Sequence, residues 1–161
     1  LKGPQTLVEI FRTIDEADLV IAGEGSIRSQ LEAQSAGVGN IRFVGQLPER
    51  ELASLYRKAQ AVIVPSLCHE VFGLVVIEAL AAGTPAIVRR LGALPELIEE
   101  GRTGYTYSTD DELRRAIHTL CARDTQAVMG IQARAAYEAR WTLNRHLEAY
   151  MALIASLRPR P

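Results

Sequence analysis

Hydrophobic residues follow two alternating periods along this chain. Short, mainly apolar runs closed by glycine or proline are typical of strands buried on both faces of a sheet. Between these runs, hydrophobic residues recur every three or four positions, as on one face of a helix. The runs cover residues 19–22, 41–44, 61–64, 85–88 and 105–107. The alternation predicts a doubly wound, Rossmann-like α/β fold with a parallel sheet, followed by helices alone from Asp110 onward.

The predicted helices have recognisable start and stop signals. Ser26 is expected to cap the second helix, because its hydroxyl can accept a hydrogen bond from a free N–H of the first turn. Gly83 is expected to end the fourth helix. The predicted helices cover residues 7–14, 26–36, a segment opened by Pro48, 73–82 and 94–100.

Composition and charge exclude several classes of protein. The 161 residues suffice for one domain, and 48% of them are apolar. The net charge of −1 argues against nucleic-acid binding, which calls for a clustered positive surface. Cys68 and Cys121 are too few for a disulfide framework, so we expect a reducing compartment, the cytoplasm. The most apolar stretch, 74–82, is too short to cross a membrane and contains Glu78.

Two short motifs of other enzyme classes lack the residues that their chemistry needs. The segment 15–18 spells Asp-Glu-Ala-Asp, as in ATP-dependent helicases, but the chain has no glycine-rich phosphate loop with Lys-Ser or Lys-Thr. Gly23 and Gly25 follow a strand as in a dinucleotide-binding turn, but Arg28 stands where the third glycine belongs. We therefore interpret both segments as ordinary turns.

The segment Pro65–Pro85, with the sequence PSLCHEVFGLVVIEALAAGTP, is the most informative part of the chain. A loop carrying Glu70 leads from a strand into a helix that carries Glu78. The first N–H groups of a helix lack intrahelical partners, so those of Phe72, Gly73 and Leu74 can bind a phosphate. Two carboxylates flanking an anion site match a sugar, a diphosphate and a ribose in a row. Because Glu78 lies in an apolar run, we expect it to need a polar partner.

This segment resembles the E-x-F-G-x-x-x-x-E donor-binding motif of the retaining GT-B glycosyltransferases, in particular family four, in which the two glutamates form an E-x7-E pair. The resemblance extends over most of the chain, and the matching pieces occur in the same order as in the family. The other matching pieces are Lys2-Gly3, the strand and turn at 19–25, the strand at 41–47, Pro65-Ser66, Ala82-Gly83-Thr84-Pro85, Gly92-Ala93-Leu94-Pro95-Glu96 and Gly101-x-x-Gly104. Gly92-Ala93 replaces the family's usual Gly-Gly.

The resemblance implies a role for each matching residue. Glu70 would bind the hydroxyls of the donor sugar, and Glu78 would bind the ribose hydroxyls. The N–H groups of residues 72–74 would hold the sugar and the diphosphate. Lys2 would pair with the diphosphate, so that Glu70 and Lys2 are the expected catalytic residues, and the backbone at Leu47 would meet the nucleobase. The family needs no metal ion or other cofactor for this chemistry, and the chain has no D-x-D motif.

Three further residues have side chains that often carry chemistry. Cys68 and His69 occupy positions that vary in the family, and we expect neither to be catalytic. We expect Trp141, in the C-terminal helices, to be a packing residue.

The resemblance also implies what lies outside residues 1–161. These residues would form the nucleotide-sugar-binding C-terminal domain, with the first strand of its sheet and an N-terminal acceptor domain upstream. An absent central strand predicts either a gap between the strands at 19–22 and 61–64 or another segment that fills it. This chain alone would bind donor without transferring sugar, and any contact with the inner membrane face would come through the upstream domain.

Two other functions stay open at the level of sequence. They are a GT-B nucleotide-sugar epimerase and a non-catalytic nucleotide-sugar-binding module. The base of the donor (UDP, GDP or ADP), its sugar and the acceptor stay open as well.

Overall fold

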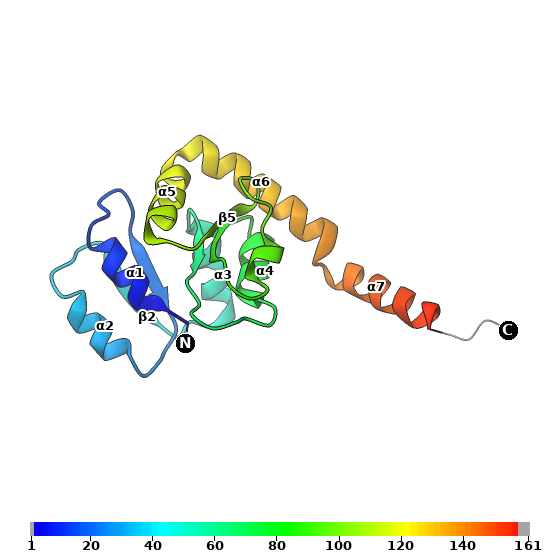
Figure 1. Ribbon diagram of the computed structural model, residues 1–161, viewed down its shortest axis with the longest axis horizontal. Coiled ribbons are helices and arrows are strands. Elements are labelled where there is room, and N and C mark those ends of the chain that lie inside the picture. The colour runs from blue at the N-terminus through cyan, green and yellow to red at the C-terminus, as the bar shows by residue number, and fades with distance from the viewer. Residues whose placement is uncertain (1, 158–161) are drawn as a thin grey trace.

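The computed structural model describes residues 2–157, which form an α/β unit with helices at its C-terminal end (Figure 1). In chain order the elements are α1 (Pro4–Phe11), β1 (Leu19–Ala22), α2 (Arg28–Gln34), β2 (Ile41–Gly45), α3 (Glu49–Lys58), β3 (Val62–Val64), α4 (Leu74–Ala81), β4 (Ala86–Arg89), the 3-10 helix η1 (Leu94–Leu97), β5 (Gly104–Tyr107), α5 (Asp110–Cys121), α6 (Arg123–Arg140) and α7 (Leu143–Ser156). The predicted fold class is confirmed.

The strands are all parallel and form two separate hydrogen-bonded sets. One set is β1–β2 and the other is β3–β4–β5, with Leu19 opposite Ile41 and Val62 opposite Ala86. Within residues 2–157, no ladder joins β1 to β3. The predicted gap between these strands is therefore confirmed, and it lies where the doubly wound order places its first, central strand.

The hydrophobic core joins the two sets of strands across this gap. One cluster of buried residues combines β1 and β2 with β4 and β5, together with α1 and α5. A second cluster packs α4, η1 and α6 against β3 and β4. Successive residues of β4 enter different clusters, since Ile87 belongs to the first, whereas Ala86 and Val88 belong to the second. The helices thus cover both faces of the sheet, as the alternating pattern predicted.

Several predicted helix boundaries are wrong, and α1, for example, covers Pro4–Phe11 instead of residues 7–14. The cap of α2 is Ile27, not Ser26, because Arg28 N–H donates to the carbonyl oxygen of Gly25 and so forms a tight turn around Ser26. The helix predicted for 94–100 is a single 3-10 turn that ends at Leu97. It stops there because Ile98 is extended and Glu99 N–H donates to the hydroxyl of Thr103 instead of to the preceding turn.

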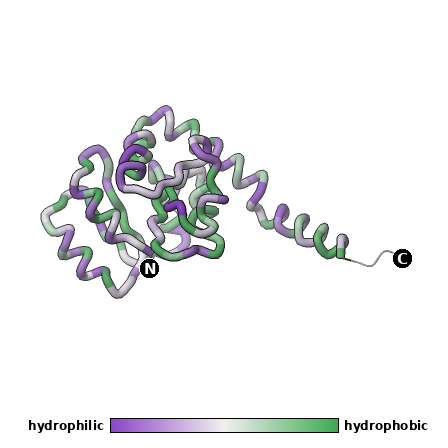
Figure 2. Tube along the Cα trace, viewed as in Figure 1, coloured by the Kyte–Doolittle hydropathy of each residue, from purple (hydrophilic) through white to green (hydrophobic). Residues whose placement is uncertain are grey.

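The last helix extends away from the rest of the fold (Figure 1). The strongly hydrophilic residues of α7 lie in its first half, whereas its second half is mostly hydrophobic (Figure 2), and none of its residues is buried. None of the helices in residues 2–157 combines the length and the apolar character needed to cross a membrane.

Candidate functional site

A close contact at the carboxyl end of β3 places Lys2 at the candidate site. Pro65 and Ser66 follow this strand and are both buried. Gly3 has a φ of 74°, and a Cβ atom there would clash with the carbonyl oxygen of Pro65. Only glycine combines this left-handed backbone with such a close approach. The contact brings Lys2, the neighbour of Gly3, to the end of β3.

Lys2, Ser66 and Glu70 meet at one carboxylate oxygen. Lys2 Nζ and Ser66 Oγ each donate a hydrogen bond of 2.6 Å to Glu70 Oε1. The Lys2 side chain is 74% exposed, whereas that of Glu70 is only 17% exposed. The hydrogen bonds from Lys2 and Ser66 lower the pKa of Glu70 below its ordinary value, so the side chain is a carboxylate at neutral pH.

The segment that follows β4 supports the backbone beside this carboxylate. Gly92 has a φ of 63°, and a Cβ atom there would lie 3.0 Å from Glu70 N and 3.1 Å from His69 Cα. Ala93 N–H donates a 3.2 Å hydrogen bond to Glu70 O. The Gly-Ala-Leu-Pro motif thus fixes the loop that carries Glu70.

The N-terminus of α4 follows directly on this loop. Gly73 caps the helix with a φ of 95°, and a Cβ atom there would lie 2.8 Å from Leu94 Cδ2 and 3.1 Å from Leu97 Cδ1. The helix begins at Leu74, one residue after the predicted start at Gly73. The first N–H groups of α4 have no intrahelical partner and carry partial positive charge, so this end of the helix can bind an anion.

Glu78 has the polar partner that the sequence predicted for it. Tyr56 Oη, on α3, donates a 3.0 Å hydrogen bond to Glu78 Oε2, and Glu78 itself is exposed. Burial and this hydrogen bond raise the pKa of Tyr56 well above its ordinary value, so Tyr56 stays a donor. Thr84 Oγ1 donates a 2.7 Å hydrogen bond to the carbonyl oxygen of Tyr56. The turn after α4 therefore holds α3 against the site.

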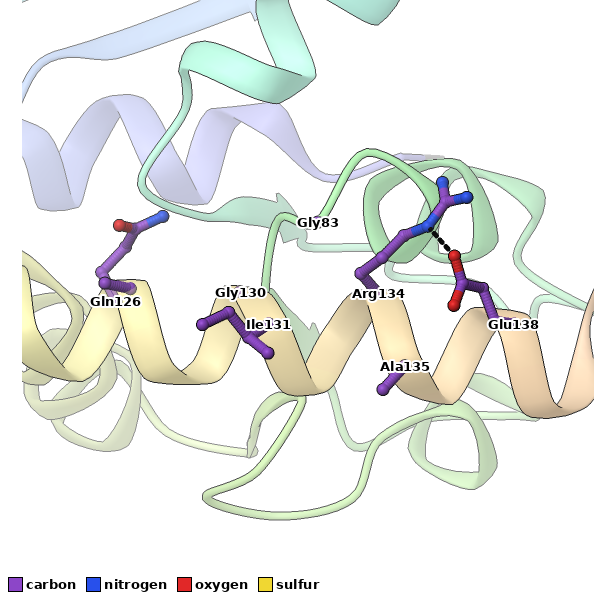
Figure 3. A pocket seen from close by; sticks show the side chains of 8 residues that line it. Gly83, Gln126, Gly130, Ile131, Arg134, Ala135 and Glu138 are labelled. Atoms are coloured by element: carbon purple, nitrogen blue, oxygen red, sulfur yellow. Dashed lines mark hydrogen bonds and ion pairs between the residues drawn. The ribbon is translucent and has the colours of Figure 1, made fainter.

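A shallow groove along α6 contains none of the predicted site residues. It is lined by Gly83, Gln126, Gly130, Arg134 and Glu138, with Arg134 ion-paired to Glu138 (Figure 3). Within residues 2–157, no group of three or more His, Cys, Asp or Glu side chains is arranged to hold a metal ion.

Comparison with known proteins identifies the family. A family model described as "Glycosyl transferases group 1" matches residues 1–123. The chain belongs to this family. The resemblance to GT-B glycosyltransferases is therefore confirmed at the level of family and fold.

Two curated relatives of this chain come from Mycobacterium tuberculosis. A GDP-mannose-dependent alpha-(1-6)-phosphatidylinositol dimannoside mannosyltransferase is 38% identical over 109 residues, which are 67% of this chain and 28% of that protein. A glycogen synthase is 37% identical over 133 residues, which are 81% of this chain and 32% of that protein. The chain thus spans about a third or less of the length of these relatives.

Solved structures of glycosyltransferases have the same fold. Sucrose-phosphate synthase from Thermosynechococcus elongatus superimposes with a TM-score of 0.82 and 27% identity, over 96% of this chain and 43% of that one. Alr3699/HepE from Anabaena, solved in complex with UDP, gives a TM-score of 0.84 at 22% identity, over 97% of this chain and 46% of that one.

The structure unites most of the predicted site residues. Lys2 and Glu70 are in contact, and residues 72–74 lead into α4, which Gly73 caps and Leu74 begins. Glu78 lies one turn further along α4 and pairs with α3. Leu47 is half-buried two residues past β2, so it belongs to the other set of strands.

Two polar partners of the site were not predicted. The sequence does place Ser66 at the end of a buried strand, but not within reach of Glu70. Nothing in the sequence indicates a role for Tyr56 at the site, because only the packing of α3 on α4 brings it to Glu78.

Proposed function

We propose that this chain is the donor-binding domain of a retaining glycosyltransferase that moves a sugar from a nucleotide sugar to an acceptor hydroxyl. One observation carries the proposal. Glu70 is fixed as a carboxylate by Lys2 and Ser66, directly before the anion-binding end of α4. This position is at the carboxyl ends of the strands, beside the gap where the strand order reverses, which is where doubly wound folds bind ligands.

The donor would lie across the carboxyl ends of both sets of strands. The sugar hydroxyls donate to Glu70, and the diphosphate lies against the N–H groups of residues 72–74 and Lys2. The ribose diol reaches Glu78, and the base lies at the backbone of Leu47. The relatives support a nucleotide-sugar donor, since one mannosyltransferase is GDP-mannose-dependent and HepE was solved with UDP and with UDP-glucose.

The chemistry follows from the charges at the site. The bond between the anomeric carbon and the phosphate oxygen breaks, and its electron pair goes to the departing nucleoside diphosphate. The acceptor oxygen bonds the same carbon with retained configuration, and its proton passes to an oxygen of the departing diphosphate. Lys2 and the N-terminal N–H groups of α4 stabilise the charge on the diphosphate, and no metal is needed for this step. Removing one such donor costs about 3–4 kcal/mol in enzymes that stabilise an oxyanion.

Donor binding would change the partner of Lys2. Its ammonium group is exposed and makes one close ion pair, with Glu70. The diphosphate carries more charge than the carboxylate, so it competes for Lys2 and leaves Glu70 to accept from the sugar. The acceptor would bind to a part of the protein upstream of this chain, and the chain alone would bind donor without transferring sugar.

The division of labour between the two glutamates is testable by titration calorimetry with nucleoside diphosphates and nucleotide sugars. We expect Glu78→Gln to weaken the binding of both classes of ligand by about 1.5–3 kcal/mol, because both contain the ribose. Glu70→Gln should weaken only the binding of the nucleotide sugar and leave the affinity for the nucleoside diphosphate unchanged.

Glu138→Gln, which changes an exposed carboxylate on α6, is the matched control and should bind like the unchanged chain. Unchanged diphosphate affinity in Glu78→Gln would refute the ribose role. Equal losses for both ligands in Glu70→Gln would refute the sugar role. In the whole protein, transfer of the sugar to an acceptor distinguishes this function from that of an epimerase.

A further inference from the structure

An aromatic contact links the donor loop to the end of α6. Phe72 and Trp141 meet edge to face, with ring centroids 5.7 Å apart and an interplanar angle of 75°. Phe72 lies in the segment between β3 and α4 and is 43% exposed. Trp141 is the C-cap of α6, at the junction with α7, and it is the only tryptophan of the chain.

Trp141 is itself firmly held. Its backbone N–H donates a 2.8 Å hydrogen bond to the carbonyl oxygen of Tyr137, and its side chain packs against the core cluster of α4, η1 and α6. The Arg140 guanidinium lies 5.1 Å from the centre of the ring and pairs with Glu99 at 3.7 Å. A ring anchored to a long helix thus contacts a ring on a loop.

We propose that Trp141 is a positioning residue for donor binding, a role that rests on the proposed function. One side of the loop packs closely on η1, since a Cβ atom at Gly73 would lie 2.8 Å from Leu94 Cδ2 and 3.1 Å from Leu97 Cδ1. Trp141 fixes the other side through the ring of Phe72. Together they hold the N–H groups of residues 72–74 in the orientation that the diphosphate requires. Trp141 does not touch the donor, and it acts only through Phe72.

Donor affinity in Trp141 variants tests this role. The probes are UDP-glucose, GDP-mannose and ADP-glucose, and the one that binds best is titrated by calorimetry. Edge-to-face pairs contribute enough stabilisation that Trp141→Leu should weaken binding about three- to tenfold. Trp141→Phe keeps an aromatic ring at this place and should restore binding to within about twofold of the unchanged chain. Tyr150→Leu removes an exposed aromatic ring on α7 that stacks on His146, and it serves as the matched control with unchanged affinity.

The single tryptophan gives a second, spectroscopic readout. Donor binding should change the fluorescence of Trp141, because Phe72, which contacts this ring, directly precedes the cap of α4. Phe72→Leu should abolish that change and weaken binding as Trp141→Leu does. The double variant should bind no more weakly than either single variant, since both changes remove the same contact.

The outcomes separate this role from the proposed function. Failure of the unchanged chain to bind any of the three donors overturns the proposed function, and the role of Trp141 with it. Donor binding by the unchanged chain with full affinity in Trp141→Leu overturns only the role of Trp141. Should Trp141→Leu fail to fold, full affinity and an unaltered fluorescence response in Phe72→Leu overturn it instead.

Discussion

Glu70 shows how one side chain depends on two partners from distant parts of the chain. Lys2 precedes it by 68 positions, and Ser66 lies four positions before it at the end of β3. Their hydrogen bonds lower the pKa of Glu70 from its ordinary value of 4.5. A carboxyl group with a lowered pKa in the folded state stabilises the fold above its ordinary pKa, and this contribution disappears as the pH falls through the lowered value.

Glu70→Gln therefore predicts a pH-dependent difference in stability. The free energy of unfolding of the unchanged chain should exceed that of the variant by a constant amount at pH values above the ordinary pKa of 4.5. This difference should shrink in more acidic solution. Urea unfolding of both proteins between about pH 7 and pH 3 measures it. Glu16 and Glu112 also have lowered pKa values, so only the difference between the two proteins reports on Glu70. A margin that stays the same at every pH contradicts the prediction.

Replacement of Gly3 by alanine should destabilise the fold, although the added group is only a methyl. Gly3→Ala forces a left-handed backbone on a residue with a side chain, which costs about 1–2 kcal/mol, and the new methyl group collides with Pro65. We expect a loss of more than about 2 kcal/mol in the free energy of unfolding.

Gly39→Ala is the matched control for this substitution. Gly39 has no positive φ, and a methyl group added there would have no neighbouring atom within 4 Å, so the replacement should leave stability within about 0.5 kcal/mol. Similar losses of stability at both glycines would contradict the prediction that the backbone and the close approach to Pro65 require glycine at position 3.

At the level of elements, the ends of the helices differ in how much they stabilise the fold. Thr109 and Glu112 form a capping box at α5, in which the hydroxyl accepts from Glu112 N–H and the carboxylate accepts from Thr109 N–H. Thr142 caps α7 in a similar way, by accepting from Arg145 N–H. The two helices differ in burial, because α5 has four buried residues and α7 has none.

Removal of these caps should therefore have unequal effects. We expect Thr109→Ala to lower the free energy of unfolding by about 1 kcal/mol, because α5 must form for the core to pack. Thr142→Ala should reduce helix content without moving the unfolding midpoint, since α7 contributes no buried side chain. Circular dichroism during thermal unfolding measures both quantities. Equal shifts of the midpoint would mean that α7 is part of the cooperative unit.

At the scale of the whole molecule, the gap between β1 and β3 leaves two strand edges without a neighbouring strand in residues 2–157. Leu19 N–H donates to the carbonyl oxygen of Asn40, directly before β2, and Val62 N–H donates to that of Pro85, directly before β4. Successive residues of a strand point their backbone groups to opposite sides. The N–H groups of Val20 and Ile63 therefore face the gap.

Amide hydrogen exchange can detect these open edges. We expect Val20 and Ile63 to exchange faster than Leu19 and Val62, because an amide without a hydrogen-bonded partner is poorly protected. A longer form of the protein that places a strand in the gap should slow exchange at both residues. Equal protection of all four amides in this chain would mean that the gap is closed.

The sequence by itself determined the order of the elements, the parallel sheet and the place of the candidate site. Each of these follows from local signals, such as the alternation of apolar runs with helical spacing, or Glu70 in a loop before a helix. The missing pairing between β1 and β3 was predictable as well, because Lys2-Gly3 resembles the pair that follows the central strand in the family.

Only the tertiary structure decided which side chains meet. Ser66 reaches Glu70 because the loop folds back over the end of β3, and Tyr56 reaches Glu78 because α3 packs on α4. Trp141 contacts Phe72, which is remote from it in the sequence, because α6 lies against α4. Such contacts depend on how whole elements pack. The spacing of residues along the chain specifies each element but does not encode the distance between two of them.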